Sequence, residues 1–490
     1  MADTGIESGV LERAGLPTRE VAAWLSSMPD VRVSFEATAD AVSRYLRSGQ
    51  SLDARLPESA RRSAAEQAAH EALNMAMDSA RDAFLRAHTA ALYDDVTAGR
   101  SRALRLEDLL LAASARVPGL VPTTSELATE RAKSLPDKDG IELAQGILLA
   151  HVLAQPASGR HLLDAMLRPL PEAFERLNKL RAMGEVDLGP VRVTRRGRAG
   201  ILELSNPKHL NAEDDITLGP TECAVDLMLL DPEIEVGVIR GGPVDHPRYQ
   251  GRRVFGSGIN LTRLYYGRID YLFYMLRDLG YVNKIYRGIS LPDPDTSALV
   301  SPVAGDGVVE KLWIAAVERF AVGGACQLLH VVDHVIATRG SRLFLPARNE
   351  GIIPGASNLR LPRFVGDRAA RQAILSGREW TAGEPDATQL CDEVVAADEV
   401  DSAVEARIEA LTSSGLVNAT ANRCTLRAGQ EPIDLFREYM ATFALEQARC
   451  HLSPALVRNL EVHWNARGRT ASADLEAGRD SARYRPSSQI

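Results

Sequence analysis

The spacing of apolar residues divides the chain into a helical part and a mixed part. Within the first 190 residues, segments such as 63–91 and 141–153 carry apolar side chains three or four positions apart, which predicts amphipathic helices. From about residue 190, apolar stretches of helical length at 216–230 and 269–287 alternate with short β-branched runs at 191–194, 201–204, 236–239, 312–317 and 334–338. Alternation of strands and helices predicts an α/β core.

Helical periodicity returns near the end of the chain and suggests how the whole is divided. After about residue 398 we expect helices at 403–412 and 432–447, followed by a polar end rich in Arg, Ser and Asp. We therefore expect an N-terminal helical domain (1–190), an α/β core (191–400), a C-terminal helical region (401–466) and a flexible tail (467–490).

Composition narrows the class of protein. Of 490 residues, 45% are hydrophobic and 25% charged, as in globular proteins, and the net charge of −8 disfavours nucleic-acid binding. No apolar run is long enough for a membrane span, and the N-terminal segment has no basic and apolar leader. We expect a cytoplasmic protein with reduced thiols, because the cysteines are scattered and odd in number: Cys223, Cys326, Cys391, Cys424 and Cys450.

Two glycine-bearing segments follow apolar strands and are candidates for ligand contact. One is Arg-Val-Phe-Gly-Ser-Gly-Ile-Asn at 253–260, and the other ends in Gly-Gly-Ala-Cys-Gln at 323–327. Neither matches a dinucleotide or ATP phosphate loop. Each alone is often only a tight turn. Together, their backbone N–H groups could converge on a developing oxyanion, as the carbonyl of a thioester requires.

Four separated motifs resemble the crotonase (enoyl-CoA hydratase/isomerase) superfamily, in its order, over roughly residues 191–400. They are Ser-Asn-Pro-Lys-His-Leu-Asn at 205–211, the run 312–338, Leu-Pro-Ala-Arg-Asn-Glu-Gly-Ile-Ile-Pro-Gly-Ala at 345–356, and the segment 374–395. The resemblance implies an α/β crotonase fold, a spiral of ββα turns, with a CoA thioester ligand and trimers or dimers of trimers. It also implies an oxyanion hole formed by the backbone N–H groups of Ile259 and Gly324.

Departures from the superfamily pattern point to a particular reaction. Hydratases of the superfamily carry glutamates at the positions of Gln327 and Ala347, and water addition needs such a pair. The long N-terminal extension, Asn260 and the runs 276–288 and 350–364 resemble instead the cofactor-independent dioxygenases of glycopeptide-antibiotic biosynthesis. That resemblance implies conversion of 3,5-dihydroxyphenylacetyl-CoA and O₂ to 3,5-dihydroxyphenylglyoxylate and CoA, with no metal and no flavin.

The same resemblance assigns roles to three polar side chains. Glu213 matches a contact to a ring hydroxyl, Arg277 a residue that holds the ring hydroxyls or phenolate, and Gln327 a neutral polar group near the thioester. Without the resemblance, Glu213 would be an acid at a helix N-terminus and Arg277 a surface cation. Gln327 would then be a helix N-terminal amide.

Further residues are candidates for binding the CoA part of the ligand. Arg253 matches a basic position before the oxyanion loop, and Gln447 lies on a C-terminal helix. The other candidates for substrate or CoA binding are Lys208, His209, His246, Arg248 and Asn260. Arg319 stands where crotonases commonly have glycine. If that glycine has a positive φ, we expect the turn at Arg319 to differ.

Two alternatives to the dioxygenase remain, and one apparent metal site is dismissed. His330-Val-Val-Asp-His334 has a spacing that could seat a metal on one helix, but the resemblance ends the helix near His330, so we expect none. The alternatives are another crotonase reaction on an acyl-CoA, namely hydrolysis, isomerisation or decarboxylation, and a non-catalytic scaffold whose N-terminal helices bind a partner protein.

Overall fold

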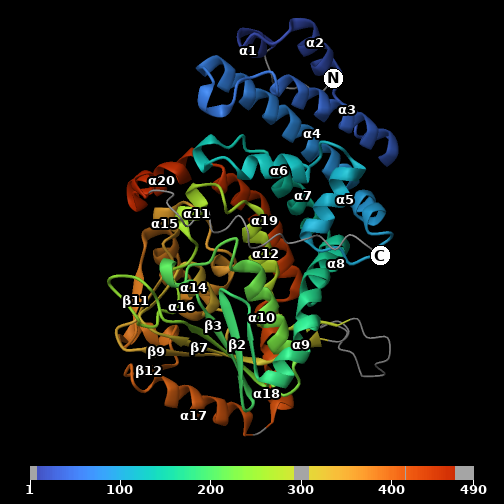
Figure 1. Cartoon of the computed structure of the whole chain (residues 1–490). Coiled ribbons are helices and arrows are strands. Elements are labelled where there is room, and N and C mark those ends of the chain that lie inside the picture. Colours follow the sequence, from blue (N-terminus) through green and yellow to red (C-terminus); the bar gives the residue numbers. More distant parts are fainter. Residues whose placement is uncertain (1–7, 292–307, 414, 470–490) are drawn as a thin grey trace.

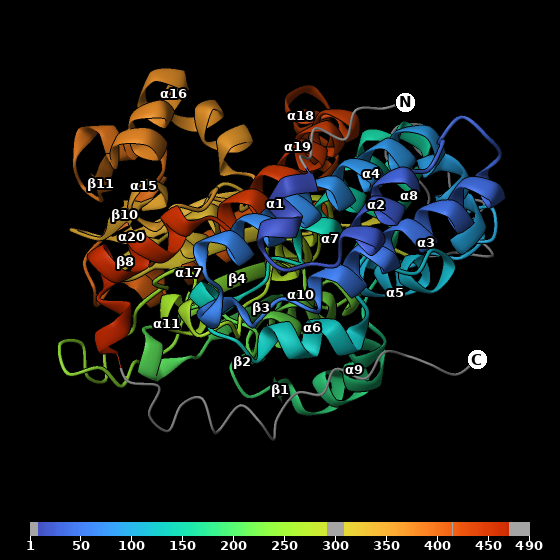
Figure 2. The ribbon, with the colours of Figure 1, turned by 90° about the horizontal axis from the view of Figure 1, so that it is seen from above.

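The structure is a computed structural model that describes residues 8–291, 308–413 and 415–469. Figure 1 shows helices from the N-terminal part stacked at one end of the molecule and a mixed α/β body at the other. Seen from above in Figure 2, the first helices lie over the body beneath them. The tail predicted for 467–490 falls, from residue 470 on, outside the described residues.

Among residues 8–184, which the structure describes, nine α-helices precede the sheet, and local signals explain where some of them begin. The longest starts with a capping box, in which the Ser63 side chain accepts from the N–H of Glu66 and the Glu66 side chain accepts from the N–H of Ser63. The helices predicted at 63–91 and 141–153 are confirmed as α4 and α7. The set comprises α1 Ser8–Arg13, α2 Thr18–Ser26, α3 Phe35–Asp53, α4 Ala64–Val96, α5 Leu106–Arg116, α6 Thr124–Arg131, α7 Leu143–Ala154, α8 Pro156–Leu167 and α9 Pro171–Met183.

A seven-stranded sheet forms the centre of the α/β body. Its order is β1 Glu185–Asp187, β2 Val191–Arg196, β3 Ala199–Leu204, β4 Val236–Gly241, β7 Leu312–Val317, β9 His334–Thr338 and β12 Glu393–Val395. The first three strands are antiparallel, and the pairs from β3 to β12 are parallel. All five predicted strand runs are confirmed. Every residue of β7 is buried, as a parallel strand covered on both faces requires.

Smaller sheets and helices surround this centre. Strands β11 Glu379–Thr381, β10 Arg342–Phe344 and β8 Phe320–Val322 form a second sheet, and β5 Ile289–Ser290 pairs with β6 Val308–Val309. The helices here are α10 Leu218–Leu230, α11 Leu261–Tyr265, α12 Leu272–Leu279, α13 Tyr281–Arg287, α14 Gly324–Leu328, α15 Ala347–Glu350 and α16 Ser357–Ser376. Short 3₁₀ turns are η1 Ser59–Arg61, η2 Leu135–Asp137, η3 Pro207–His209, η4 Pro385–Gln389 and η5 Ala466–Gly468.

The single helix predicted over 269–287 is wrong, because the chain breaks at Gly280. This residue has a ψ of −117° and divides the segment into α12 and α13. An added Cβ at Gly280 would lie 2.3 Å from the carbonyl oxygen of Leu276 and 3.0 Å from Oε2 of Glu222. The close packing at this break therefore leaves no room for a side chain at position 280.

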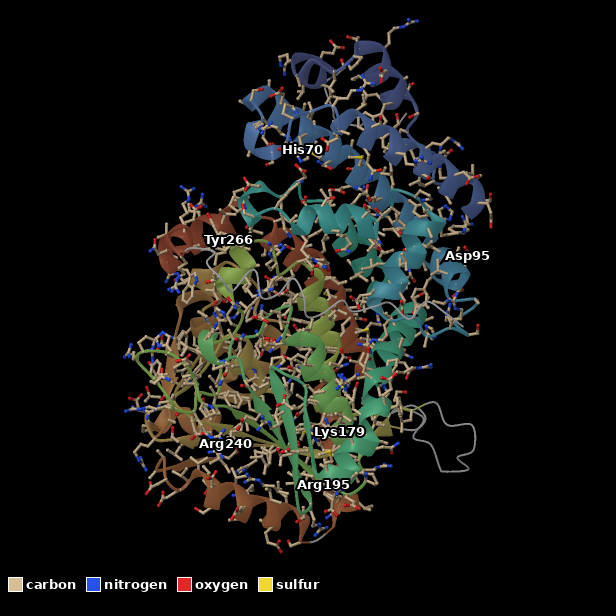
Figure 3. The ribbon with its side chains drawn as sticks, viewed as in Figure 1. His70, Asp95, Lys179, Arg195, Arg240 and Tyr266 are labelled. Carbon is tan, nitrogen blue, oxygen red and sulfur yellow. The ribbon has the colours of Figure 1, made fainter. Side chains whose placement is uncertain are left out.

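Four α-helices of the described C-terminal part, residues 400–469, return to both ends of the molecule. They are α17 Val400–Thr412, α18 Leu416–Gln430, α19 Ile433–His451 and α20 Pro454–Trp464. Helix α17 packs on the sheet, and Arg240 of β4 (Figure 3) pairs there with Glu318, at 3.0 Å, and with Asp401. Helix α19 instead packs against α7, so closely that an added Cβ at Gly146 would lie 2.6 Å from the Cβ of Ala448.

The buried apolar side chains cross the expected domain boundaries. One core joins the N-terminal helices to α12, α19 and α20, while a second lies between the sheet and α9, α10, α13 and α16. A third core lies between the sheet and α17. The division into four regions stays a prediction, but most of the N-terminal helices share one hydrophobic core with the C-terminal helices α19 and α20.

Candidate active site

The two glycine-bearing segments meet edge to edge. Gly256 bridges to Ala321 of β8, and Ile259 bridges to Glu213. Gly258 has a φ of +83°, and an added Cβ there would lie 2.9 Å from the oxygen of Val322 and 3.2 Å from the nitrogen of Gly324. This approach of the two backbones therefore needs glycine at position 258.

Two backbone N–H groups remain available where the segments meet. Gly324 is the first residue of α14, where a helix leaves its N–H without an intrahelical acceptor. Within the described part of the chain, neither Ile259 N–H nor Gly324 N–H donates to a backbone carbonyl. Both residues line the same cavity. This arrangement can serve an oxyanion, although the role itself stays a prediction.

One cavity collects all five residues predicted to be catalytic. Its walls come from the two glycine segments, from α12 and from the stretch around α15, and most of them are apolar. The lining residues are Glu213, Ile259, Phe273, Tyr274, Arg277, Asp278, Gly323, Gly324, Gln327, Pro346, Ala347, Glu350, Ile352, Ile353, Pro354 and Gly355.

Arg277 is the centre of the polar wall. Its guanidinium forms a two-pronged ion pair with Glu213 and donates to Oε1 of Gln327 at 2.7 Å and to the carbonyl of Gly324 at 2.8 Å. Burial is the largest single effect and lowers the pKa of Arg277, but the attractions of Glu213, Tyr281 and Asp278 together outweigh it, so the pKa is raised. With Arg277 only 3% exposed, its interpretation as a surface cation is wrong.

Glycines keep this cluster compact. An added Cβ at Gly324 would lie 2.9 Å from Oε2 of Glu213 and 3.2 Å from Nη2 of Arg277. Gly355 has a φ of +47°, and an added Cβ there would lie 2.5 Å from Oε1 of Gln327. Side chains at either position would therefore push the polar groups out of place.

Two buried acids in the cavity were missed by sequence reasoning. Asp278 is 3% exposed, accepts from the N–H of Ala356 at 3.3 Å and lies 3.8 Å from Nη1 of Arg277; burial raises its pKa. Glu350 is 9% exposed, and burial raises its pKa to about 7. The one signal in the sequence was a carboxylate directly before the apolar Gly-Ile-Ile-Pro run.

The basic residues predicted to bind CoA lie near the first glycine segment but not in the cavity wall. Lys208 and His209 end the turn η3, and the carbonyl of His209 accepts from Ser257 at 3.0 Å. His246 and Arg248 follow β4, where the N–H of Arg248 donates to Nδ1 of His246 at 3.2 Å. Their contact with CoA stays a prediction.

Arg253 and Asn260, also predicted to bind CoA, have structural partners, and their contact with CoA stays a prediction. Arg253 pairs with Glu203 at 2.5 Å and donates to the carbonyl of Gly241 at 3.0 Å. Asn260 caps α11 by accepting from the N–H of Arg263 at 3.2 Å, and it does not line the cavity.

Gln447 is likewise behind the cavity wall rather than in it. Its side chain is fully buried, and Oε1 accepts from the N–H of Ile353 at 2.9 Å. Through this hydrogen bond, α19 is tied to the Ile353 segment of the cavity wall, and the contact of Gln447 with a ligand stays a prediction.

The turn at Arg319 keeps the conformation that glycine favours. Arg319 itself has a φ of +71°, and its carbonyl accepts from the N–H of Arg342 at 3.0 Å. Replacement of glycine therefore does not require a different turn, and the expectation of altered loop geometry is wrong.

The His330–His334 segment does not converge on one point. His330 contacts the hydroxyl of Ser357 at 3.1 Å, while Asp333 accepts from the N–H of Trp313 at 2.8 Å and pairs with Arg423 at 2.7 Å. His334 begins β9. Among the described residues, no group of three or more His, Cys, Asp or Glu is placed to hold a metal ion.

In the residue ranges that the structure describes, no helix has both the length and the apolar character needed to cross a membrane.

Comparison with known proteins agrees with the geometry. Residues 307–434 match the enoyl-CoA hydratase/isomerase family model. The chain belongs to this family, the crotonases, which confirms the resemblance and the fold class.

Among individual relatives, the chain is 46% identical over 399 residues to the (3,5-dihydroxyphenyl)acetyl-CoA 1,2-dioxygenase of Amycolatopsis orientalis, covering 80% of this chain and 88% of the relative. A probable mitochondrial enoyl-CoA hydratase of Dictyostelium discoideum is 26% identical over 207 residues, covering 42% of this chain and 64% of the relative. The crystal structure of a carnitinyl-CoA hydratase from Mycobacterium avium has 22% sequence identity and a TM-score of 0.44, and covers 58% of this chain and 96% of that one.

Proposed function

We propose that this protein is a dioxygenase that converts (3,5-dihydroxyphenyl)acetyl-CoA and O₂ to 3,5-dihydroxyphenylglyoxylate and CoA without a metal or flavin. The observation that carries the proposal is the buried cluster of Glu213, Arg277 and Gln327 beside two available backbone donors at Ile259 and Gly324. The similarity to a dioxygenase named for this substrate supports it.

The first chemical step makes the substrate electron-rich. The N–H groups of Ile259 and Gly324 bind the thioester oxygen, which acidifies Cα and stabilises the enolate; one such donor contributes about 2.7–4 kcal/mol. Arg277 and Glu213 hold the hydroxyls of the ring, where Arg277 stabilises phenolate character and Glu213 accepts a hydroxyl proton. The aromatic ring then spreads the negative charge of the enolate.

The enolate itself supplies the electrons for O₂. Transfer of one electron gives a substrate radical and superoxide, which recombine to a peroxide at Cα. The terminal peroxide oxygen attacks the thioester carbonyl and expels the CoA thiolate. Cleavage of the O–O bond with loss of the second Cα proton leaves the ketone and a carboxylate, so both oxygen atoms of O₂ enter the product.

An apolar wall protects these reactive species from water. The cavity that holds the polar groups is also lined by the apolar residues Phe273, Ile352, Ile353 and Pro354. Exclusion of water strengthens the hydrogen bonds to the enolate and limits its reprotonation by solvent. The lack of paired acids at positions 327 and 347 argues against hydration as the reaction.

Oxygen uptake by metal-stripped protein tests the function. We expect consumption of one O₂ per CoA released when the purified, chelator-treated chain receives (3,5-dihydroxyphenyl)acetyl-CoA, and much slower turnover with phenylacetyl-CoA, which lacks the hydroxyls. CoA release without O₂ uptake would support a hydrolase instead. Restoration of activity only by added iron or flavin would refute the cofactor-free mechanism.

We further propose assembly as a trimer or a dimer of trimers, as the family resemblance implies. Light scattering during size-exclusion chromatography measures the mass directly; a monomer of 53.2 kDa would refute this assembly.

A further inference from the structure

The proposed reaction needs a group that accepts the Cα proton, and the cavity contains three carboxylates. Glu213 is ion-paired with Arg277, and Asp278 accepts from the N–H of Ala356 and lies near the same guanidinium. Both carboxylates thus already have hydrogen-bond or charge partners within the cluster around Arg277. Glu350 differs: within the described ranges, no hydrogen bond or ion pair engages its side chain.

The backbone places Glu350 beside the oxyanion site. Helix α15 starts after Pro346, whose Cδ would lie 3.8 Å from a Cβ added at Gly323. Ala347 and Glu350 are three positions apart on this helix, hence on one face, and both line the cavity with Ile259 and Gly324. A side chain that is nine-tenths buried thus faces the space where the thioester would bind.

The surroundings of Glu350 suit a base that works near neutral pH. Burial raises its pKa to about 7, so its carboxylate is more basic than one in water and still partly ionised. The neighbour Tyr274 on α12 stays a neutral phenol, since burial and then the charge of Glu350 raise its pKa well above the usual value. An unpartnered buried carboxylate is costly, and such groups concentrate at functional sites.

We propose that Glu350 is the catalytic base that removes the Cα proton of the bound thioester. This inference rests on the proposed function. The electron pair of the C–H bond moves into the enolate, and the proton moves to a carboxylate oxygen of Glu350. When the thioester is cleaved, the neutral acid returns this proton to the departing CoA thiolate, and the base is regenerated.

Deuterium exchange without oxygen isolates the proton-transfer step. In anaerobic D₂O the wild-type chain should exchange the Cα hydrogens of (3,5-dihydroxyphenyl)acetyl-CoA, as followed by mass spectrometry. We expect Glu350→Gln to slow this exchange about 100-fold or more while thioester binding stays within a few-fold, because Gln keeps the size but cannot accept the proton. Glu350→Asp should keep part of the activity.

Two controls separate a catalytic from a structural role. Glu446→Gln, which changes an exposed carboxylate on α19 paired with Arg449, should exchange like the wild type. In the wild type, the exchange rate should rise as the pH increases through about 7, and this rise should be absent from Glu350→Gln. If Glu350→Gln folds poorly, a wild-type rate that does not change between pH 6 and pH 8 overturns the assignment.

The outcomes distinguish this inference from the proposed function. Wild-type exchange rates in Glu350→Gln with bound thioester would overturn the role of Glu350 and leave the dioxygenase standing. Exchange that depends on Glu350 in a protein that never consumes O₂ would support the base and refute the dioxygenase.

Discussion

Replacing Glu350 with Gln should stabilise the folded chain, and increasingly so as the pH rises. Glu350 is buried without an ion-pair partner among the described residues, and its pKa rises from 4.5 to about 7. Each pKa unit corresponds to about 1.4 kcal/mol, so keeping the ionised carboxylate in the fold costs about 3 kcal/mol at pH 8. The folded state binds the extra proton between these two pKa values. The contribution of Glu350 to stability is therefore retained below pH 4.5 and lost as the pH rises towards 7.

Urea unfolding at pH 5 and pH 8 measures this effect. At pH 5 the wild type and Glu350→Gln should differ by less than about 1 kcal/mol in the free energy of unfolding, while at pH 8 the variant should be more stable by about 3 kcal/mol. The other titratable groups that line the cavity with Glu350 (Glu213, Tyr274, Arg277 and Asp278) are the same in both proteins, so their contributions largely cancel. A variant that is less stable than the wild type at pH 8, or a gap that does not grow with pH, would show that Glu350 has a stabilising partner.

Three more substitutions test the site and the packing. Arg277→Ala should lower turnover at least 100-fold with a smaller change in KM for CoA thioesters, because it leaves Glu213 buried without its cation; unchanged oxygen uptake would contradict the role of Arg277. Gly324→Ala should reduce kcat strongly, since the new methyl group would lie 2.9 Å from Oε2 of Glu213, and steady-state kinetics that match the wild type would refute this. Gly146→Ala should destabilise the fold by about 1–3 kcal/mol through overlap with Ala448, which calorimetry measures; a melting temperature equal to the wild type's would show that α7 and α19 can separate without cost.

The central strands could be predicted from the sequence because strands that are buried on both faces consist of continuous apolar residues. The run 312–317 is apolar throughout, and as β7 it is buried on both faces of the sheet. The break at Gly280 could not be predicted in this way. At Gly280 the chain also lies close to Glu222 of α10, 58 residues earlier, and a local pattern does not record such a contact.

The site shows a similar limit. The five residues predicted to be catalytic are scattered along the chain, and no periodic pattern predicts that they lie together: Glu213, Ile259, Arg277, Gly324 and Gln327. The family resemblance predicted a shared site, and in the structure all five line one cavity. Resemblance was less useful where a residue's importance comes from its surroundings. Glu350 is an ordinary acid in the sequence, and its unusual character arises from burial without a partner among the residues that the structure describes.

The contact between α7 and α19 has a consequence for how the protein is made. Helix α7 is almost entirely apolar, and its partner lies roughly 280 residues further along the chain. At 5–20 residues per second, a ribosome takes roughly 15 s to a minute to supply that partner. During this time the apolar surface of α7 lacks its α19 partner and stays exposed in the nascent chain. Production in a heterologous host should therefore benefit from added chaperones.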